Sequence, residues 1–227
     1  MPGENLTRKE AIERASIVSV ESYSVEIDLT QGEELFGSTT RVRFSAKEGS
    51  STFIDAITGA VHSVVLNGKV LQPAEVSDGI RIQLPALEKD NELVVVAQGK
   101  YTNTGEGLHR FVDPVDQEVY LYTQFEVPDS RRMFAVFEQP DLKASFSFNI
   151  TAPSYWKVVS NSPTPEPHEL REGVSVWNFE PTPRISSYIT ALVAGPYVEV
   201  NDELVSSSGK TVPLGVFCRK SLFEHLD

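Results

Sequence analysis

Residues 120–150 read YLYTQFEVPDSRRMFAVFEQPDLKASFSFNI, and this segment carries the most informative pattern in the chain. Over its first seven positions, Tyr120, Tyr122, Gln124 and Glu126 alternate with Leu121, Thr123 and Phe125. This period of two is that of a half-buried β-strand. At about 3.3 Å of rise per residue, such a strand places Gln124 and Glu126 on one face with Cβ atoms roughly 6–7 Å apart. The pattern therefore predicts an amide and a carboxylate side by side on a strand.

Two turns are expected after this strand. Pro128 fixes φ and removes a backbone donor, and the Asp and Ser that follow it can bond to their own backbone, so the chain should reverse there. Residues 131–137 are predicted to form the return strand. After a second turn at Pro140, apolar and polar residues alternate over residues 144–150, which predicts a third strand with one buried face.

Most of the remaining chain also has the period of two that is typical of strands. At the start, Thr7 and Glu10 have the spacing of a capping box and predict a short helix. Asn67-Gly68 lies between two apolar runs and predicts a tight type I′ hairpin. Turn residues recur about every ten residues, as in sandwiches and barrels. The predicted fold class is all-β, and further strands are expected at residues 156–159, 174–179, 185–193 and 211–218.

The last residues of the sequence predict a second helix. Ser221 and Glu224 again have capping-box spacing, three residues before the final Asp227. A helix this short does not hold on its own, because nucleation is costly and stability comes from packing. We therefore expect a C-terminal helix that is cut off, in a chain that is a piece of a longer protein.

Charge and composition make some partners unfavourable. The 227-residue chain has a formal net charge of −12, and its Lys and Arg residues are scattered. Nucleic acids and anionic membranes need clustered basic residues, so we expect neither partner. The chain has no apolar run long enough for a membrane span, no apolar signal-peptide core near its start and one cysteine, Cys218. These features predict a cytoplasmic protein.

The sequence shows no motif for catalysis. A zinc peptidase of the thermolysin type needs two His one helical turn apart. The nearest approach is residues 168–172, HELRE, where Glu stands in place of the second His. His109 lies beside an Arg with no second ligand, and we interpret it as a loop or packing residue. We therefore expect neither a metal site nor a catalytic residue in this chain.

The segment around Glu126 resembles a known family. The run Thr-Gln-Phe-Glu at residues 123–126 and the residues after it are similar to the N-terminal domain of bacterial zinc metalloaminopeptidases of the aminopeptidase N family, which are gluzincins. The later matching positions are Asp129, Arg131, Phe134, Phe137 and Pro140. Many members have Phe-Asp-Glu-Pro where this chain has Phe-Glu-Gln-Pro at residues 137–140, and this departure keeps the aromatic residue and the turn proline.

The resemblance covers almost the whole chain and implies a specific architecture. It implies a large antiparallel, saddle-like, multi-sheet β-sandwich with a short N-terminal helix. Residues 1–218 would form the N-terminal β domain, and residues 219–227 would begin the missing catalytic domain. The chain would then be truncated before the domain that carries the zinc-binding and exopeptidase motifs.

The resemblance also implies a function. In that family the polar side chains of the matching motif hold the free α-amino group of the substrate, which makes Gln124 and Glu126 the substrate-binding residues here. The complete protein would be a zinc-dependent aminopeptidase that removes single residues from peptide N-termini. Its partners would be peptides with free N-termini and the missing catalytic domain of the same chain. The fragment alone is expected to be inactive and to bind no zinc.

Three alternatives stay open at the level of sequence. Gln124 and Glu126 could simply lie on the solvent face of a sheet, as most strand carboxylates do. The chain could be a stand-alone all-β binding module in which Tyr120 and Tyr122 form an exposed platform for a carbohydrate or protein ligand. It could also belong to an epoxide-hydrolysing relative similar to leukotriene A4 hydrolase, which shares this domain.

Overall fold

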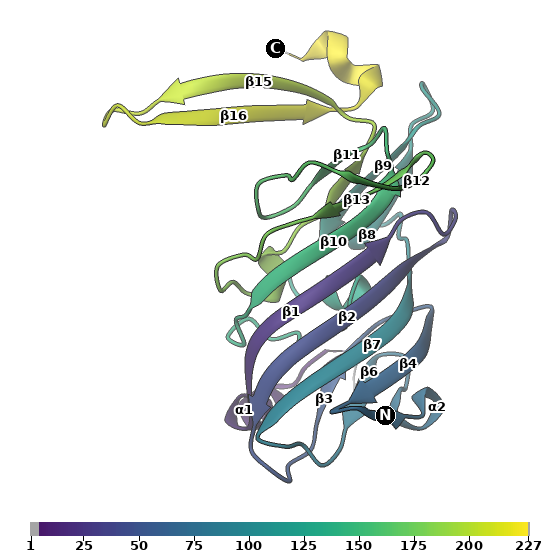
Figure 1. Ribbon diagram of the computed structural model, residues 1–227, viewed down its shortest axis with the longest axis vertical. Helices are drawn as coiled ribbons and strands as arrows, with labels where there is room; N and C mark the ends of the chain where they lie inside the picture. Colours follow the sequence, from purple (N-terminus) through teal and green to yellow (C-terminus); the bar gives the residue numbers. More distant parts are fainter. Residues whose placement is uncertain (1–4, 227) are drawn as a thin grey trace.

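A computed structural model describes residues 5–226 of the chain and shows an elongated, mainly β structure (Figure 1). Short helices lie at its two ends and in its connections. The elements in chain order are α1 (Arg8–Ile17), β1 (Val18–Asp28), β2 (Leu35–Ala46), β3 (Thr52–Asp55), β4 (Ala60–Leu66), β5 (Lys69–Leu71), α2 (Pro73–Val76), β6 (Arg81–Leu84), β7 (Asp90–Lys100), β8 (Gly107–Val112), β9 (Val119–Gln124), η1 (Ser130–Arg132), β10 (Ser145–Pro153), β11 (Lys157–Val159), β12 (His168–Arg171), β13 (Val174–Asn178), η2 (Ser187–Ile189), β14 (Val193–Gly195), β15 (Val198–Val205), β16 (Thr211–Cys218) and η3 (Lys220–His225).

The largest layer is a curved sheet of eight strands in the order β12-β13-β10-β1-β2-β7-β4-β5. Its strands are mostly antiparallel, and the predicted type I′ hairpin joins β4 to β5 with positive φ at both Asn67 and Gly68. β10 is different, because it runs parallel to β1 with Val25 opposite Phe148. A parallel pair needs a long crossover connection, and all the chain from β2 to β9 supplies it. The antiparallel prediction is therefore correct for most of this sheet and wrong at this pair.

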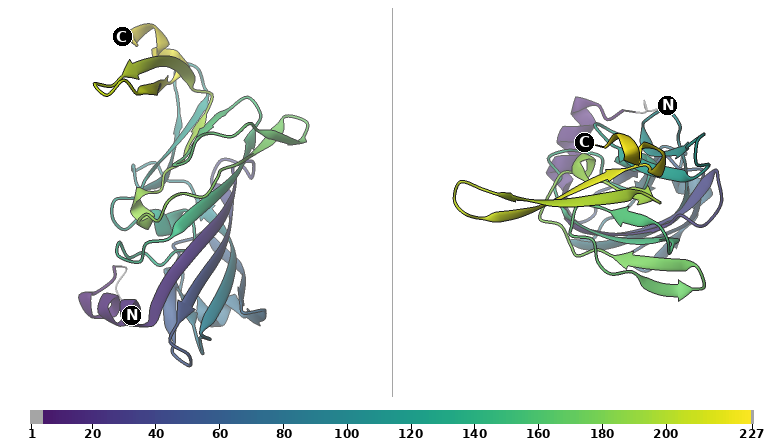
Figure 2. Two further views of the ribbon diagram at one scale, coloured as in Figure 1. Left: turned by 60° about the vertical axis from the view of Figure 1, so that its left-hand side comes forward. Right: turned by 90° about the horizontal axis from the view of Figure 1, so that it is seen from above.

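A second sheet of four strands, in the order β11-β14-β9-β8, packs against the large one to form a sandwich (Figure 2). The predicted alternation of residues 144–150 is confirmed, because Phe146, Phe148 and Ile150 are buried. Tyr23 of β1 stacks on Phe146 with ring centroids 4.7 Å apart. The interior therefore consists of aromatic and branched side chains from both layers, as the fold class predicts.

The predicted return strand at residues 131–137 does not form. After β9 the chain turns through η1 and then crosses the interior, and residues 133–137 are all buried in succession. A strand would bury every second side chain, whereas this apolar run is enclosed on all sides. It is held by two backbone hydrogen bonds between Val136 and Asp55 and by the Phe137 N–H, which donates to the Tyr23 hydroxyl at 3.1 Å. The strand predicted at residues 185–193 is also wrong, because most of it is the 3₁₀ turn η2 and irregular chain.

The helix α1 is attached to the sandwich through charged groups. Its capping box is present, as Thr7 and Glu10 predict. Its buried residue is Arg14, whose Nη1 lies 2.6 Å from Asp55 Oδ2 and whose guanidinium lies over the ring of Phe53. Arg81 of β6 reaches Glu10 at 2.6 Å. Ion pairs with buried members therefore fix the first helix to β3 and β6.

The last two strands form a two-stranded ribbon that projects from the body (Figures 1 and 2). β16 ends at Cys218, and the 3₁₀ helix η3 follows. The capping box predicted at Ser221 is not formed. Arg219 is the N-cap, and the Ser221 hydroxyl instead donates to Asp113 Oδ2 at 2.5 Å. This hydrogen bond ties the end of the chain to the loop between β8 and β9.

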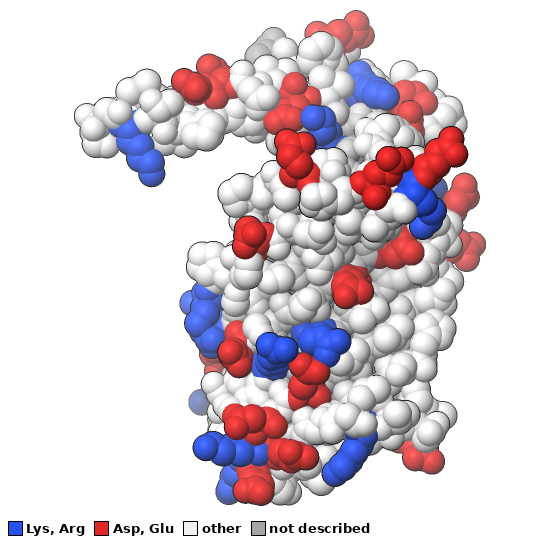
Figure 3. Space-filling model, in the orientation of Figure 1, with Lys and Arg blue, Asp and Glu red and all other residues white. Residues whose placement is uncertain are grey.

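Charged residues of both signs are spread over the face of the large sheet (Figure 3). Arg41 and Arg43, for example, both pair with Glu92 across β2 and β7. Within residues 5–226, no helix has the length and apolar character needed to cross a membrane.

We predict that Asp55→Ala will lower the free energy of unfolding of this chain by about 3–5 kcal/mol, because the change leaves the buried Arg14 without its carboxylate. Urea denaturation followed by circular dichroism measures the effect. The matched control is Glu92→Ala, which removes exposed pairs with Arg41 and Arg43 and should cost about 1 kcal/mol or less. Equal losses in the two variants would contradict the role given to the buried pair.

The ion pair of Glu10 predicts a pH dependence. The hydrogen bond from Arg81 is the main reason that the pKa of Glu10 falls from 4.5 to about 2. A carboxylate with a lowered folded pKa stabilises the fold above its unfolded pKa, and this contribution is lost as the pH falls through the folded pKa. Glu10→Gln should therefore lose less stability than the parent chain between about pH 5 and about pH 2. Denaturation at several pH values tests this, with exposed Glu13→Gln of the same helix as the control that should follow the parent curve.

Candidate functional site

The site begins where β9 ends. On one face of β8 and β9, three facing pairs follow one another: Phe111 and Tyr120, then His109 and Tyr122, then Gly107 and Gln124. The opposite face of these strands carries Leu108 and Leu121, which are buried in the core. Gln124 is therefore the last residue of an outward-facing row, at the end of the strand and exposed.

Glu126 lies in the turn beyond the strand, so the predicted placement of both residues on one strand face is wrong. The structure nevertheless brings the two residues together, because the Glu126 N–H donates to Gln124 Oε1 at 3.0 Å. Phe125 between them is buried and packs edge-to-face on Phe134 with centroids 6.3 Å apart. A buried aromatic anchor thus holds the segment while its two polar neighbours stay exposed.

The two side chains present acceptors for a cation. Among the described residues, no hydrogen bond or ion pair involves the carboxylate of Glu126. The Gln124 oxygen has a second lone pair beyond the one that accepts the Glu126 N–H. An ammonium group carries three donors and a positive charge, and charge-assisted hydrogen bonds to a carboxylate are among the stronger ones. The two side chains therefore offer the kinds of acceptor that a primary amine needs.

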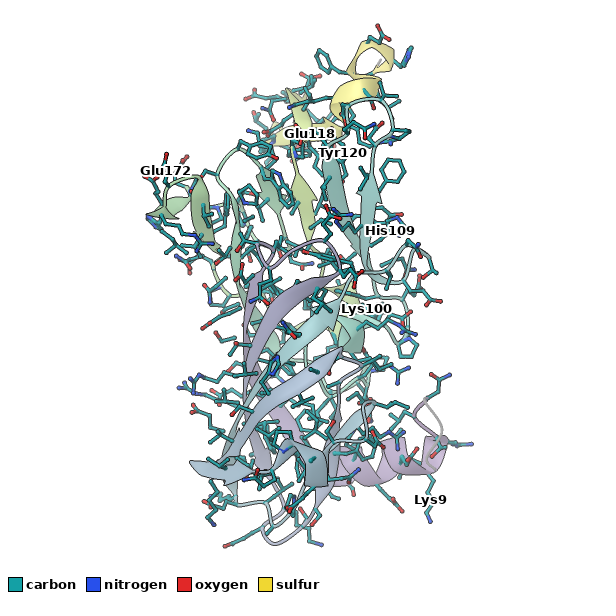
Figure 4. The ribbon with its side chains drawn as sticks, turned by 90° about the vertical axis from the view of Figure 1, so that its right-hand side faces the viewer. Lys9, Lys100, His109, Glu118, Tyr120 and Glu172 are labelled. Carbon is teal, nitrogen blue, oxygen red and sulfur yellow. The ribbon has the colours of Figure 1, made fainter. Side chains whose placement is uncertain are left out.

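An aromatic cavity of about 430 Å³ lies farther along the same row, toward the C-terminal segment. His109 stacks on Tyr122 with centroids 4.7 Å apart, and its Nδ1 accepts the Gly105 N–H at 3.0 Å. The interpretation of His109 as a packing residue agrees with these contacts. Figure 4 shows His109 on the strand beside the one that carries Tyr120, below the end of the chain.

The exposed platform suggested for a binding module is not present at Tyr120. Its side chain is 1% exposed, and its hydroxyl donates to Asp116 at 2.7 Å and accepts the Lys220 N–H at 3.1 Å. Burial raises the pKa of Tyr120 to about 12. Tyr122 is 40% exposed, so only one of the two proposed platform residues is exposed, and the other is covered by Tyr197 and the C-terminal segment.

The described residues do not fit a zinc site. In residues 5–226 no group of three or more His, Cys, Asp or Glu side chains is placed to hold a metal ion. The HELRE run at residues 168–172 begins with the strand β12, where two residues four apart cannot form the face of one helical turn. The prediction of zinc for the complete protein therefore concerns residues outside this part of the chain.

Three residues around the site, Thr123, Glu138 and Ser187, were given no role by the sequence analysis. The Thr123 hydroxyl accepts the Leu192 N–H at 2.8 Å, and buried Glu138 accepts hydrogen bonds from Ser130 and Ser187. The hydroxyl of Ser187 is 2.6 Å from Glu138 Oε1. A possible signal was a glutamate between an apolar run and a turn proline, but its partners come from segments that are far away in sequence.

Comparison with known proteins gives consistent matches. Residues 19–189 match the model of the peptidase M1 N-terminal domain. The chain is 57% identical to aminopeptidase N of Streptomyces lividans over its whole length, which is 26% of that relative, and 34% identical over 67% of its length to aminopeptidase N of Acetobacter pasteurianus. The crystal structure of Legionella pneumophila aminopeptidase A in complex with aspartic acid superposes on 93% of the chain with a TM-score of 0.80 at 18% identity, and the match spans 25% of that structure.

We predict that zinc and chelators will not change the stability of this chain. A metal that binds the folded state raises the melting temperature by mass action, and no described cluster offers it enough ligands. Thermal unfolding with equimolar zinc, with EDTA and with neither should give superimposable curves. Stoichiometric zinc binding in calorimetry, or a loss of melting temperature in EDTA, would contradict this expectation.

Proposed function

The chain belongs to the peptidase M1 family through its N-terminal domain, and from this membership we propose that it is the substrate-anchoring domain of a zinc-dependent aminopeptidase. Its matches span 26% of the length of the Streptomyces lividans relative and 39% of the Acetobacter pasteurianus relative. The proposed substrates are peptides with a free N-terminus. The proposed reaction removes one residue at a time from that end.

One observation carries the proposal: exposed Gln124 and Glu126 are joined by a hydrogen bond at the end of β9. The buried Phe125 fixes the backbone between them, so the points from which the two side chains project are set before a ligand arrives. The main effect of this binding would be positioning, because a held α-amino group places the first peptide bond at a fixed distance from the site. The domain would thereby define which bond is cut.

Hydrolysis itself is assigned to residues that this chain does not hold. The described residues lack a metal cluster, so the zinc site and the residues that work with it belong to the rest of the proposed longer polypeptide, which is also the proposed partner of this domain. The proposed compartment is the cytoplasm, in support of which the chain has a single cysteine, Cys218. Under this proposal, the isolated chain is inactive.

In the longer protein, we predict that Glu126→Ala will lower kcat/KM for substrates with a free N-terminus by about ten- to a hundredfold, because a hydrogen bond to a charged group contributes about 1.5–3 kcal/mol. The kcat/KM of Glu126→Gln should lie between those of the parent protein and Glu126→Ala, since glutamine keeps an acceptor and loses the charge. Steady-state hydrolysis of aminoacyl-arylamides measures the effect.

The matched control is Glu169→Ala, which removes an exposed carboxylate from β12 and should leave kcat/KM unchanged. The isolated chain should hydrolyse none of these substrates. Unchanged kcat/KM in Glu126→Ala, or hydrolysis by the isolated chain, would overturn the proposal.

A further inference from the structure

We propose that Glu138, Ser187 and Thr123 are positioning residues that hold the Gln124–Glu126 segment in its amine-binding shape. This inference rests on the proposed function. It assigns a role to a buried carboxylate, to a serine on η2 and to the first residue of the Thr-Gln-Phe-Glu run. None of the three is exposed, and each acts on the segment through a contact that the structure shows.

The first tether lies just before Gln124. β9 pairs with β14 up to Val193, which is opposite Tyr122. One residue farther on, the Thr123 N–H donates to the Leu192 carbonyl at 3.0 Å, and the Thr123 hydroxyl accepts the Leu192 N–H at 2.8 Å. The side chain therefore completes the pairing where the regular ladder stops, and it fixes the backbone from which Gln124 projects.

The second tether lies at the start of η1, where the turn that follows Glu126 ends. One oxygen of Glu138 accepts hydrogen bonds from the Ser130 hydroxyl and from the Arg131 N–H at 2.9 Å. Its other oxygen accepts the Ser187 hydroxyl at 2.6 Å. A single buried carboxylate thus joins the turn that follows Glu126 to the 3₁₀ turn η2.

Both tethers end on the same short segment, residues 186–192. This segment is itself compact, because the N–H groups of Ile189 and Thr190 donate to the carbonyls of Ser186 and Ser187. The Ser186 hydroxyl donates to the Pro140 carbonyl at 2.6 Å, which attaches the segment to the crossing chain. The stretch from Thr123 to Arg131, which contains Gln124 and Glu126, is therefore attached near both ends to one clamp, residues 186–192.

The presence of a carboxylate at Glu138 supports a positioning role for this residue more than a role in stability alone. Burial raises the pKa of Glu138, which shows that its charged form is disfavoured by the interior, while its three donors act in the opposite direction. Apolar side chains usually fill such a space at lower cost, and the best-attested use of a buried polar group is to select one arrangement. Here the arrangement selected is the distance between the clamp and the turn after Glu126.

The test is a double-mutant cycle in the longer protein with Ser187→Ala and Glu126→Ala. Ser187→Ala alone should lower kcat/KM for free N-terminal substrates about two- to tenfold, the factor that one net hydrogen bond represents, mainly through a higher KM. Combined with Glu126→Ala, it should have no further effect, because the group that it positions is gone. Thr123→Val should behave in the same way.

Hydrogen exchange of the isolated chain gives a second readout. Ser187→Ala should raise the exchange rate of the Glu126 and Asp129 amides while the amides of β1 and β2 keep the parent rate. The matched control is Ser154→Ala, which removes a serine pair with Ser175 at 2.7 Å on another part of the sandwich and should change neither exchange nor kinetics.

Two results would overturn the inference while leaving the proposed function in place. The first is that Ser187→Ala lowers kcat/KM by the same factor with and without Glu126, which indicates a purely structural role. The second is that Ser187→Ala changes neither kinetics nor exchange although Glu126→Ala impairs turnover. If Glu126→Ala has no kinetic effect, the proposed function fails and this inference fails with it.

Discussion

Two buried carboxylates, Asp55 and Glu138, fix several segments of this structure relative to one another. A buried charge is very unfavourable unless it is paired and hydrogen-bonded, so each one fixes the position of every group that satisfies it. Asp55 Oδ2 receives Arg14 of α1 and the backbone N–H of Glu138. Glu138 in turn receives donors from η1 and η2. Four segments that are distant in sequence are thereby fixed relative to one another.

This constraint explains how an exposed polar pair can be precise. Exposed side chains at the end of a strand are normally mobile, yet the backbone around Gln124 and Glu126 is fixed on both sides and by Phe125 below. The sheet sets the direction in which the segment projects, the aromatic core holds Phe125, and the buried carboxylates fix the distances to the neighbouring segments. Under the proposed function, a fixed backbone at this point sets the distance between the held α-amino group and the bond that is cut.

The sequence predicted the elements well where local physics determines them. The capping box at Thr7, the Asn67-Gly68 hairpin and the alternation that buries Phe146 and Phe148 all depend on neighbours in the chain. The prediction of a return strand at residues 131–137 was wrong because an apolar run has the same sequence pattern in a buried strand and in an irregular segment that is enclosed by the core. The parallel pairing of β10 with β1 depends on partners more than a hundred residues apart, which no local pattern contains.

The substrate-binding role given to Gln124 and Glu126 stays a prediction. The family resemblance that suggested it agrees with the match over residues 19–189. The predicted geometry of the two residues was wrong in detail, since a turn and a side-chain hydrogen bond bring them together where a strand face was expected. The tethers through Ser187 and Leu192 could not be predicted, because these two residues lie about sixty to seventy residues after the segment that they hold, and no local pattern links them.

The most direct test of the central claim is a crystal structure of the longer protein with a bound amino acid or peptide that has a free N-terminus. The account predicts the α-amino nitrogen at about 2.7–3.2 Å from a Glu126 carboxylate oxygen and within hydrogen-bonding reach of Gln124 Oε1. A ligand whose amine is held by other groups, with Glu126 and Gln124 turned to solvent, would contradict it.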